Sequence, residues 1–167
     1  MAKKQFEEYK ECEIEDFNMR REDFKIIQSM NYEEMIPMFI EAGLEMEADE
    51  QRPEGLLTCY ELIDNNTKKR VGGASLAYIS GEYVIKTVAI KKTYQGSGLG
   101  TELVNAIIQD AKERGATRVY LSAKVPQFYK TLGFTVVPSD EAPNISTCHL
   151  CYRYHNGCDS EIMMKGL

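Results

Sequence analysis

The residues around Gly98 constrain the fold of this 167-residue chain most strongly, because the hydrophobic pattern changes its period there. After this point, apolar residues recur at helical spacing from Leu99 to Ala111. Before it, three strand-like runs follow one another with turn-rich residues between them: Leu56–Asp64, Val71–Tyr78 and Tyr83–Ile90. This order predicts an antiparallel meander that continues directly into a strand–helix–strand crossover between parallel strands.

The flanking segments complete a mixed α/β (α+β) pattern. Phe24–Gln28 has the pattern of a strand, and Asn31 is a candidate N-cap for a helix that Gly43 closes. The acidic stretch Glu45–Gly55 fits either a loop or a short second helix. Downstream, the pattern predicts a strand, a short helix and two further strands: Arg118–Ser122, Val125–Leu132, Phe134–Val137 and Glu161–Lys165.

Composition limits both the architecture and the partners. No repeat, Pro-rich linker or low-complexity stretch divides the chain, so we expect one domain over residues 1–167, with a helical N-terminal extension at 1–22 and a core at 23–165. A net charge of -6 disfavours nucleic acid as a partner. The sequence contains no membrane-spanning apolar run and no apolar signal segment at its start, so we expect a cytoplasmic protein.

The segment from Gln95 to Gly100 contains three glycines between a strand pattern and a helix pattern. Glycines allow a sharp turn, and the N-terminus of the next helix presents N–H groups, so the segment suits an anion such as a pyrophosphate. A P-loop is disfavoured because Thr101 and Glu102 follow Gly100 where a lysine is required, and the glycine spacing does not fit a dinucleotide fingerprint. A purely structural turn is the remaining alternative.

Several motifs in the same order resemble the GNAT superfamily of acetyl-CoA-dependent N-acetyltransferases. Gln95-x-x-Gly98-x-Gly100 resembles the Q/R-x-x-G-x-G/A loop that binds the acyl-CoA pyrophosphate in that family. The resemblance extends over roughly residues 23–165 and includes four further segments: Lys86–Ile90, Phe128–Phe134, Val71–Ala74 and Met163–Lys165.

The resemblance implies a fold, a reaction and a cofactor site. The fold is a mostly antiparallel mixed sheet with a central pair of parallel, splayed strands, flanked by helices. The reaction is transfer of an acetyl group from acetyl-CoA to a primary amine by direct attack. The backbones of Val88 and Ile90 would pair with pantetheine like an added strand. The pyrophosphate would lie on Gln95, Gly96, Ser97, Gly98, Gly100 and Thr101.

The resemblance places Tyr129 beside the thioester sulfur. Attack by an amine expels a thiolate, and Tyr129 is predicted to protonate it. An alternative role for Tyr129 is packing between Phe128 and Phe134.

The sequence does not identify the general base that deprotonates the acceptor. An alkylammonium with a pKa of about 10 must lose a proton before it attacks, and family members often place a glutamate on the fourth strand, where this chain has Val84. Glu82, at the preceding turn, is one candidate, although it also fits a solvated surface charge. A water chain is another candidate, ending on a backbone carbonyl or on Glu45, Glu47 or Asp49.

A cysteine and histidine cluster lies in the predicted loop 144–160. Thiolate and imidazole donors at this spacing could hold a structural zinc; the candidate ligands are Cys148, Cys151, Cys158 and His155. Because the second C-x2-C pair of a typical zinc ribbon is missing, buried thiols without metal are the alternative.

The acceptor cannot be named from the sequence. Both a small amine and a peptidic amine fit the acidic stretch Glu41–Glu54. A non-catalytic acyl-CoA sensor, or a metal- or redox-responsive protein, is the alternative from a different functional class. A homodimer is expected only because the fold that this chain resembles often dimerises.

Overall fold

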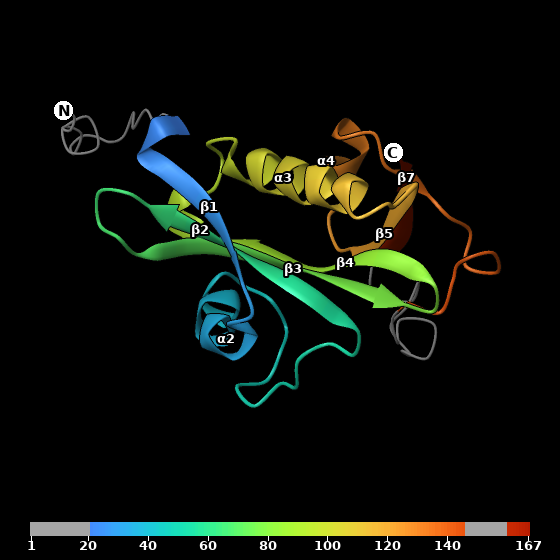
Figure 1. Cartoon of the computed structure of the whole chain (residues 1–167), viewed down its shortest axis with the longest axis horizontal. Coiled ribbons are helices and arrows are strands. Elements are labelled where there is room, and N and C mark those ends of the chain that lie inside the picture. Colours follow the sequence, from blue (N-terminus) through green and yellow to red (C-terminus); the bar gives the residue numbers. More distant parts are fainter. Residues whose placement is uncertain (1–20, 146–159) are drawn as a thin grey trace.

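A computed structural model describes residues 21–145 and 160–167 of the chain (Figure 1). The first half of the chain forms η1 (Arg21–Asp23), β1 (Phe24–Ser29), α2 (Tyr32–Glu41), β2 (Leu56–Asp64), β3 (Arg70–Ile79) and β4 (Glu82–Ile90). The second half forms η2 (Lys92–Tyr94), α3 (Leu99–Glu113), β5 (Arg118–Ala123), α4 (Pro126–Thr131), β6 (Thr135–Val136) and β7 (Glu161–Gly166).

One seven-stranded sheet organises these elements in the order β1-β2-β3-β4-β5-β7-β6. Neighbouring strands are antiparallel except for β4 and β5, which are parallel and are joined by α3. A parallel pair requires such a crossover connection. The predicted mixed fold with one central parallel pair is therefore confirmed.

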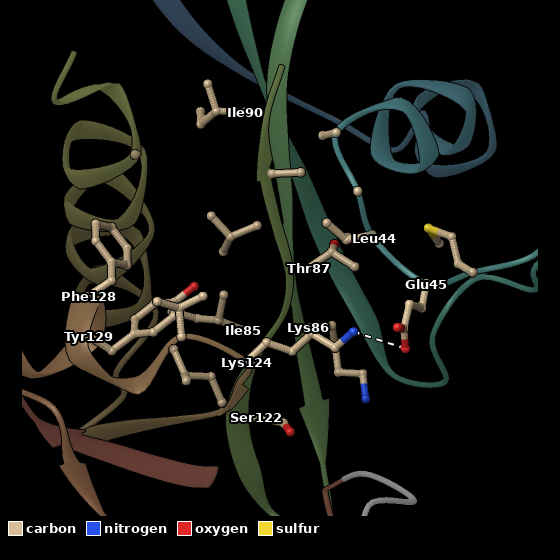
Figure 2. Close-up of a pocket in the computed structure, with 18 of the residues that line it drawn as sticks. Leu44, Glu45, Ile85, Lys86, Thr87, Ile90, Ser122, Lys124, Phe128 and Tyr129 are labelled. Carbon is tan, nitrogen blue, oxygen red and sulfur yellow. Dashed lines mark ion pairs between the residues drawn. The ribbon is translucent and has the colours of Figure 1, made fainter. Parts of the chain in front are cut away.

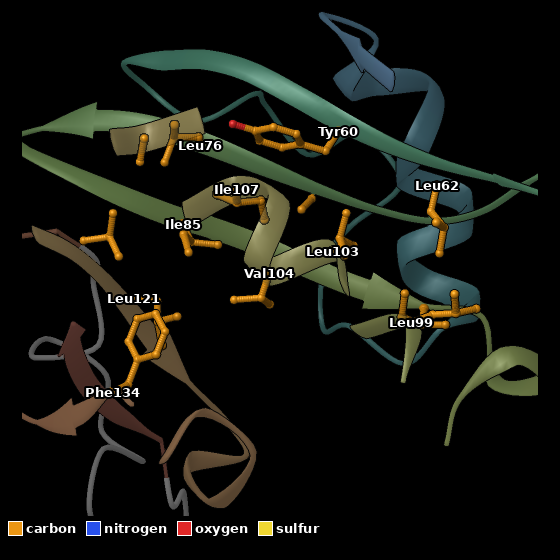
Figure 3. Close-up of a cluster of buried hydrophobic side chains, with 14 of the residues drawn as sticks. Tyr60, Leu62, Leu76, Ile85, Leu99, Leu103, Val104, Ile107, Leu121 and Phe134 are labelled. Carbon is orange, nitrogen blue, oxygen red and sulfur yellow. The ribbon is translucent and has the colours of Figure 1, made fainter. Parts of the chain in front are cut away.

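Helices cover both faces of the sheet (Figure 1). The α3 and α4 helices pack on one face over the larger core cluster, in which Leu103, Val104 and Ile107 of α3 are fully buried (Figure 3). The α2 helix packs on the other face, where Met35 and Phe39 contact Cys59 of β2 within a second cluster. The apolar spacing of each helix supplies these buried stripes.

The α2 helix begins differently from the sequence-based expectation. Asn31 occupies the N-cap position, but its side chain makes no capping hydrogen bond; its Nδ2 donates to Glu61 Oε2 at 3.1 Å. This charge-assisted bond holds the Asn31 side chain in an orientation in which its Oδ1 does not accept from the first N–H groups of the helix. The buried Glu61 also accepts from Ser29 Oγ at 2.5 Å and from Arg70 Nε at 2.9 Å, which anchors the start of α2 to the sheet.

The segment between α2 and β2 is a loop without helix, which settles the alternative that the sequence left open for residues 45–55. At its end, Gly55 has φ +78° and its carbonyl accepts from Tyr78 N at 2.9 Å. A Cβ atom on Gly55 would lie 2.2 Å from Tyr78 O. The loop can therefore approach β3 this closely only with glycine at this position.

We expect Gly55→Ala to lower the free energy of unfolding by about 3 kcal/mol, because a left-handed alanine costs ~1–2 kcal/mol and the clash with the β3 backbone adds to that. Gly81→Ala is the matched control, since Gly81 has φ +79° but open space around its Cβ position. Urea unfolding of both variants measures the difference. Equal losses of stability would contradict the role of the close approach.

Candidate active site

A cavity of about 1030 Å³ lies where β4 and β5 part (Figure 2). The described residues of the two strands pair at only three positions, Tyr83 with Val119, Val84 with Tyr120 and Ile85 with Leu121. Beyond Ile85 the strands diverge, and the rest of β4 lines the cavity as far as Ile90.

A β-bulge at Lys86 marks the point of divergence. In the register with β3, Ser75 pairs with Thr87 and Leu76 pairs with Ile85, so Lys86 is an extra residue on β4. A bulge bends its strand and increases the local twist, which turns the end of β4 away from β5.

The backbone groups of Val88 and Ile90 face the cavity. Lys91 N donates to Val71 O at 2.8 Å, so Lys91 belongs to the positions that hydrogen-bond to β3. Because hydrogen-bonding direction alternates along an antiparallel strand, Ile90 and Val88 present their N–H and C=O groups to the opposite edge. This exposed edge of β4 is the feature that an added strand-like ligand requires.

The glycine-rich turn adjoins this edge and leads into α3. Gly96 and Gly98 have φ values of +81° and +87°, and a Cβ on either would meet nothing within 4 Å. The left-handed backbone, rather than space, therefore requires these two glycines. Gln95 Nε2 donates to Ile90 O at 2.7 Å and joins the turn to the strand. The turn leaves the N-terminus of the 15-residue α3 open to the cavity, as an anion site requires.

The structure brings most of the predicted site residues together. Those that line the cavity are Val88, Ile90, Gln95, Gly96, Gly98, Gly100, Thr101 and Tyr129. Ser97 is not among the lining residues, because its Oγ turns back and donates to Tyr94 O at 2.7 Å.

Tyr129 approaches the cavity from α4. Its side chain points toward β4 (Figure 2), and its ring makes edge contacts with Phe128 and Phe134 at centroid distances of 4.9 and 5.6 Å. Burial raises the pKa of Tyr129 to about 12. The packing role and the cavity-lining position therefore coexist in one residue, which is a neutral hydrogen-bond donor near neutral pH.

Glu82 lies outside the cavity. Its carboxylate receives hydrogen bonds from Arg118 Nη2 at 2.7 Å and from Arg118 Nε at 3.1 Å, and the residue does not line the cavity. Of the three loop carboxylates proposed as ends of a water chain, Glu45 lines the cavity and Glu47 and Asp49 do not.

The face of the cavity opposite α4 is formed by α2 and the loop that follows it; we call this part the α2-side compartment. Its lining residues are Tyr32, Ala42, Gly43, Leu44, Glu45, Met46, Glu50, Gln51 and Pro53. Lys124, which follows β5, reaches across to this compartment, and its Nζ lies 3.0 Å from Glu45 Oε1 (Figure 2).

Sequence reasoning missed Lys86, Lys124 and Tyr32, which all line the cavity. Lys124 lies two residues after the predicted strand Arg118–Ser122, at the strand end where binding sites gather in α/β sheets, and this position could have identified it. Nothing local distinguished Tyr32 or Lys86 from ordinary helix and strand residues.

Comparison with known proteins agrees with this geometry. Residues 6–134 match the acetyltransferase (GNAT) family. The chain belongs to this family. The resemblance inferred from the Gln95 to Gly100 motif and the further segments is thereby confirmed.

Individual relatives are more distant. An uncharacterized N-acetyltransferase ycf52-like from Prochlorococcus marinus is 40% identical over 68 residues, which span 37% of this chain and 38% of the relative. N-acetylglutamate synthase from Neisseria gonorrhoeae, solved with coenzyme A and N-acetyl-glutamate, matches with a TM-score of 0.66 at 22% identity, over 86% of this chain and 35% of that chain. The ribosomal-protein-S18-alanine N-acetyltransferase from Escherichia coli matches with a TM-score of 0.61 at 17% identity, over 86% of this chain and 93% of that chain. At these identities the two structures establish a shared fold.

The predicted zinc ligands Cys148, Cys151, Cys158 and His155 lie outside the described residues, as does most of the predicted N-terminal extension. Within residues 21–145 and 160–167, no group of three or more His, Cys, Asp or Glu residues is arranged to hold a metal ion. The helices in the same part of the chain include none that is long and apolar enough to cross a membrane.

We expect Tyr129 to remain protonated until about pH 12, two units above an ordinary tyrosine, because its phenolate would be buried. The difference between the 295 nm titrations of the unmodified protein and Tyr129→Phe isolates this one phenol. A difference signal with a midpoint near pH 10 would contradict the buried position.

Proposed function

We propose that this GNAT protein transfers the acetyl group of acetyl-CoA to a primary amine, which attacks the thioester directly. One observation carries the proposal: a single cavity joins the free edge of β4, the N-terminus of α3 and the Tyr129 side chain. The complex of N-acetylglutamate synthase with coenzyme A, on a shared fold, supports the same use of the cavity.

The chain offers complementary groups to each part of acetyl-CoA. The N–H and C=O groups of Val88 and Ile90 match the alternating amides of the pantetheine arm. The turn at Gly96 and Gly98 presents N–H groups and the positive end of the α3 dipole to the pyrophosphate. Gln95 already binds the carbonyl of Ile90, so pantetheine pairing at that oxygen would share or replace this hydrogen bond.

The reaction forms a C–N bond and breaks a C–S bond. The neutral amine attacks the thioester carbonyl, and the CoA thiolate leaves. The attacking nitrogen then carries one proton more than the amide product, and this proton passes to solvent. Tyr129 lines the cavity from α4, and in this proposal the thioester sulfur lies within reach of its hydroxyl. The sequence-based expectation is full proton transfer from Tyr129. Because the pKa of Tyr129 is about 12, well above the ~8.5 of a free thiol, Tyr129 in this proposal instead stabilises the developing thiolate as a hydrogen-bond donor and retains its proton.

Deprotonation of the acceptor has two routes that the geometry supports. Glu45 lines the cavity and can accept the proton directly or through water. A water chain that ends on a backbone carbonyl of the open β4 edge is the other route. Glu82 fits neither route, because its carboxylate is bound by Arg118 outside the cavity.

Binding of acetyl-CoA is tested at the start of α3. Thr101→Glu introduces a carboxylate into the first turn, where it favours the helix but repels a pyrophosphate. We expect at least a tenfold rise in the Kd for acetyl-CoA by isothermal titration calorimetry, with no loss of stability in urea unfolding. Thr101→Gln is the uncharged control of similar size, and equal affinities for the two variants would contradict the assigned pyrophosphate site.

Turnover is tested at α4. We expect Tyr129→Phe to lower kcat at least tenfold, because it removes a donor that acts mainly on the leaving thiolate, while the Kd for acetyl-CoA changes less than twofold. Thiol release from acetyl-CoA in the presence of an amine library measures kcat. Binding of acetyl-CoA without turnover by any amine would favour the alternative, a non-catalytic acyl-CoA sensor.

Three further expectations, a zinc site, a homodimer and a cytoplasmic location, rest on the sequence alone. A structural zinc would be held by Cys148, Cys151, Cys158 and His155, and metal analysis of the purified protein and of Cys151→Ser tests it. A homodimer and a cytoplasmic location are the other two. Sedimentation analysis and cell fractionation address them.

A further inference from the structure

Within the described part of the chain, positive and negative side chains line the cavity in equal numbers. Its charged lining residues, among those that the structure describes, are Glu45, Glu50, Lys86 and Lys124. Two carboxylates and two ammonium groups cancel, so this lining lacks the negative excess that favours a purely cationic amine. The acidic character of the loop sequence is thus balanced by lysines that enter from β4 and from the end of β5.

One opposite pair spans the α2-side compartment. Lys124 Nζ lies 3.0 Å from Glu45 Oε1, and the two side chains are 55% and 59% exposed (Figure 2). An exposed pair of this kind adds little to stability and is readily exchanged for other partners. Each residue is held by a different segment, Glu45 by the loop after α2 and Lys124 by the link from β5 to α4, so the pair brackets the space between them.

A second observation points to a polar ligand in the same compartment. Tyr32 lines the cavity and is only 2% exposed, yet its hydroxyl has no hydrogen-bond partner within the described part of the chain. Glu50, which also lines the cavity, lies close enough to act on its ionisation. A buried hydroxyl without a hydrogen-bond partner is unfavourable unless a ligand or a water molecule supplies that partner.

We propose that the acceptor is a small primary amine that also bears a carboxylate, such as an amino acid, and that Lys124 and Glu45 select it. The inference rests on the proposed acetyltransferase function. The acceptor carboxylate takes the place of Glu45 on Lys124, and the acceptor ammonium takes the place of Lys124 on Glu45 before it is deprotonated. Tyr32 donates its hydroxyl to an oxygen of the acceptor.

This exchange of partners predicts that an acceptor with an ammonium group but no carboxylate is a poorer substrate. A zwitterion converts one ion pair within the protein into two ion pairs with the ligand, and no charge is left alone. A diamine or alkylamine can pair with Glu45, but it leaves Lys124 without a counter-ion beside a second cation.

The test compares two sets of matched acceptors. Leucine, leucinamide and isopentylamine share the amine and the apolar chain, but only leucine has the carboxylate. Glutamate, glutamate α-amide and 4-aminobutyrate differ in the position of the carboxylate relative to the amine. Thiol release from acetyl-CoA gives kcat/KM for each. We expect at least a tenfold preference for the carboxylate-bearing member of the leucine set. Lys124→Gln should remove that preference by raising KM for the acceptor, and Lys124→Glu should reverse it toward isopentylamine. Lys112→Gln, an exposed lysine on α3 outside the cavity, should leave it unchanged.

The outcomes separate this inference from the function on which it rests. Equal or greater turnover of amines without a carboxylate, or an undiminished preference in Lys124→Gln, overturns the acceptor class and leaves the acetyltransferase intact. No turnover of any acceptor also overturns the class, while calorimetric binding of acetyl-CoA preserves the cofactor site. Absence of acetyl-CoA binding overturns the proposed function itself.

Discussion

The short pairing between β4 and β5 is the constraint on which the rest of the site depends. Three register pairs hold the strands together at one end, where Ile85 and Leu121 belong to the same buried core. The bulge at Lys86 then bends β4 away, so the sheet opens at its centre without losing its antiparallel neighbours on either side. A fully paired sheet would satisfy the same backbone groups internally and leave no edge for a ligand.

Because the sheet opens at its centre, one cavity is lined by elements from both faces of the sheet. The α4 helix and the start of α3 reach the cavity from one face, and the loop after α2 reaches it from the other. In the proposed reaction, the cofactor and the acceptor approach the reacting atoms from opposite sides of the sheet. Glu61 joins Asn31, which precedes α2, to Ser29 and Arg70 of the sheet. Arg70 also donates to Glu34 O in the first turn of α2, so the start of α2 is tied to the sheet.

The parts of the site that depend on local backbone conformation were predictable from the sequence. Gly96 and Gly98 need a left-handed backbone, and that requirement is visible in the residue type alone. The parts that depend on distant contacts were not. Asn31 is a good local cap, but Glu61, thirty positions away, takes its side chain. The partner of Lys124 and the burial of Tyr32 likewise arise only when α2, β4 and β5 pack together.

The two tyrosines at the cavity suggest which groups set the pH dependence of the reaction. Burial raises the pKa of Tyr129 on one face and of Tyr32 on the other to about 12. Both phenols therefore remain neutral donors through the pH range in which an amine with a pKa of about 10 loses its proton. As pH rises toward that value, the fraction of neutral acceptor grows and the tyrosine donors are retained. In the proposed reaction, the rising limb of a pH–rate profile therefore follows the ionisation of the acceptor amine, and the two phenols, which stay protonated, do not shape it.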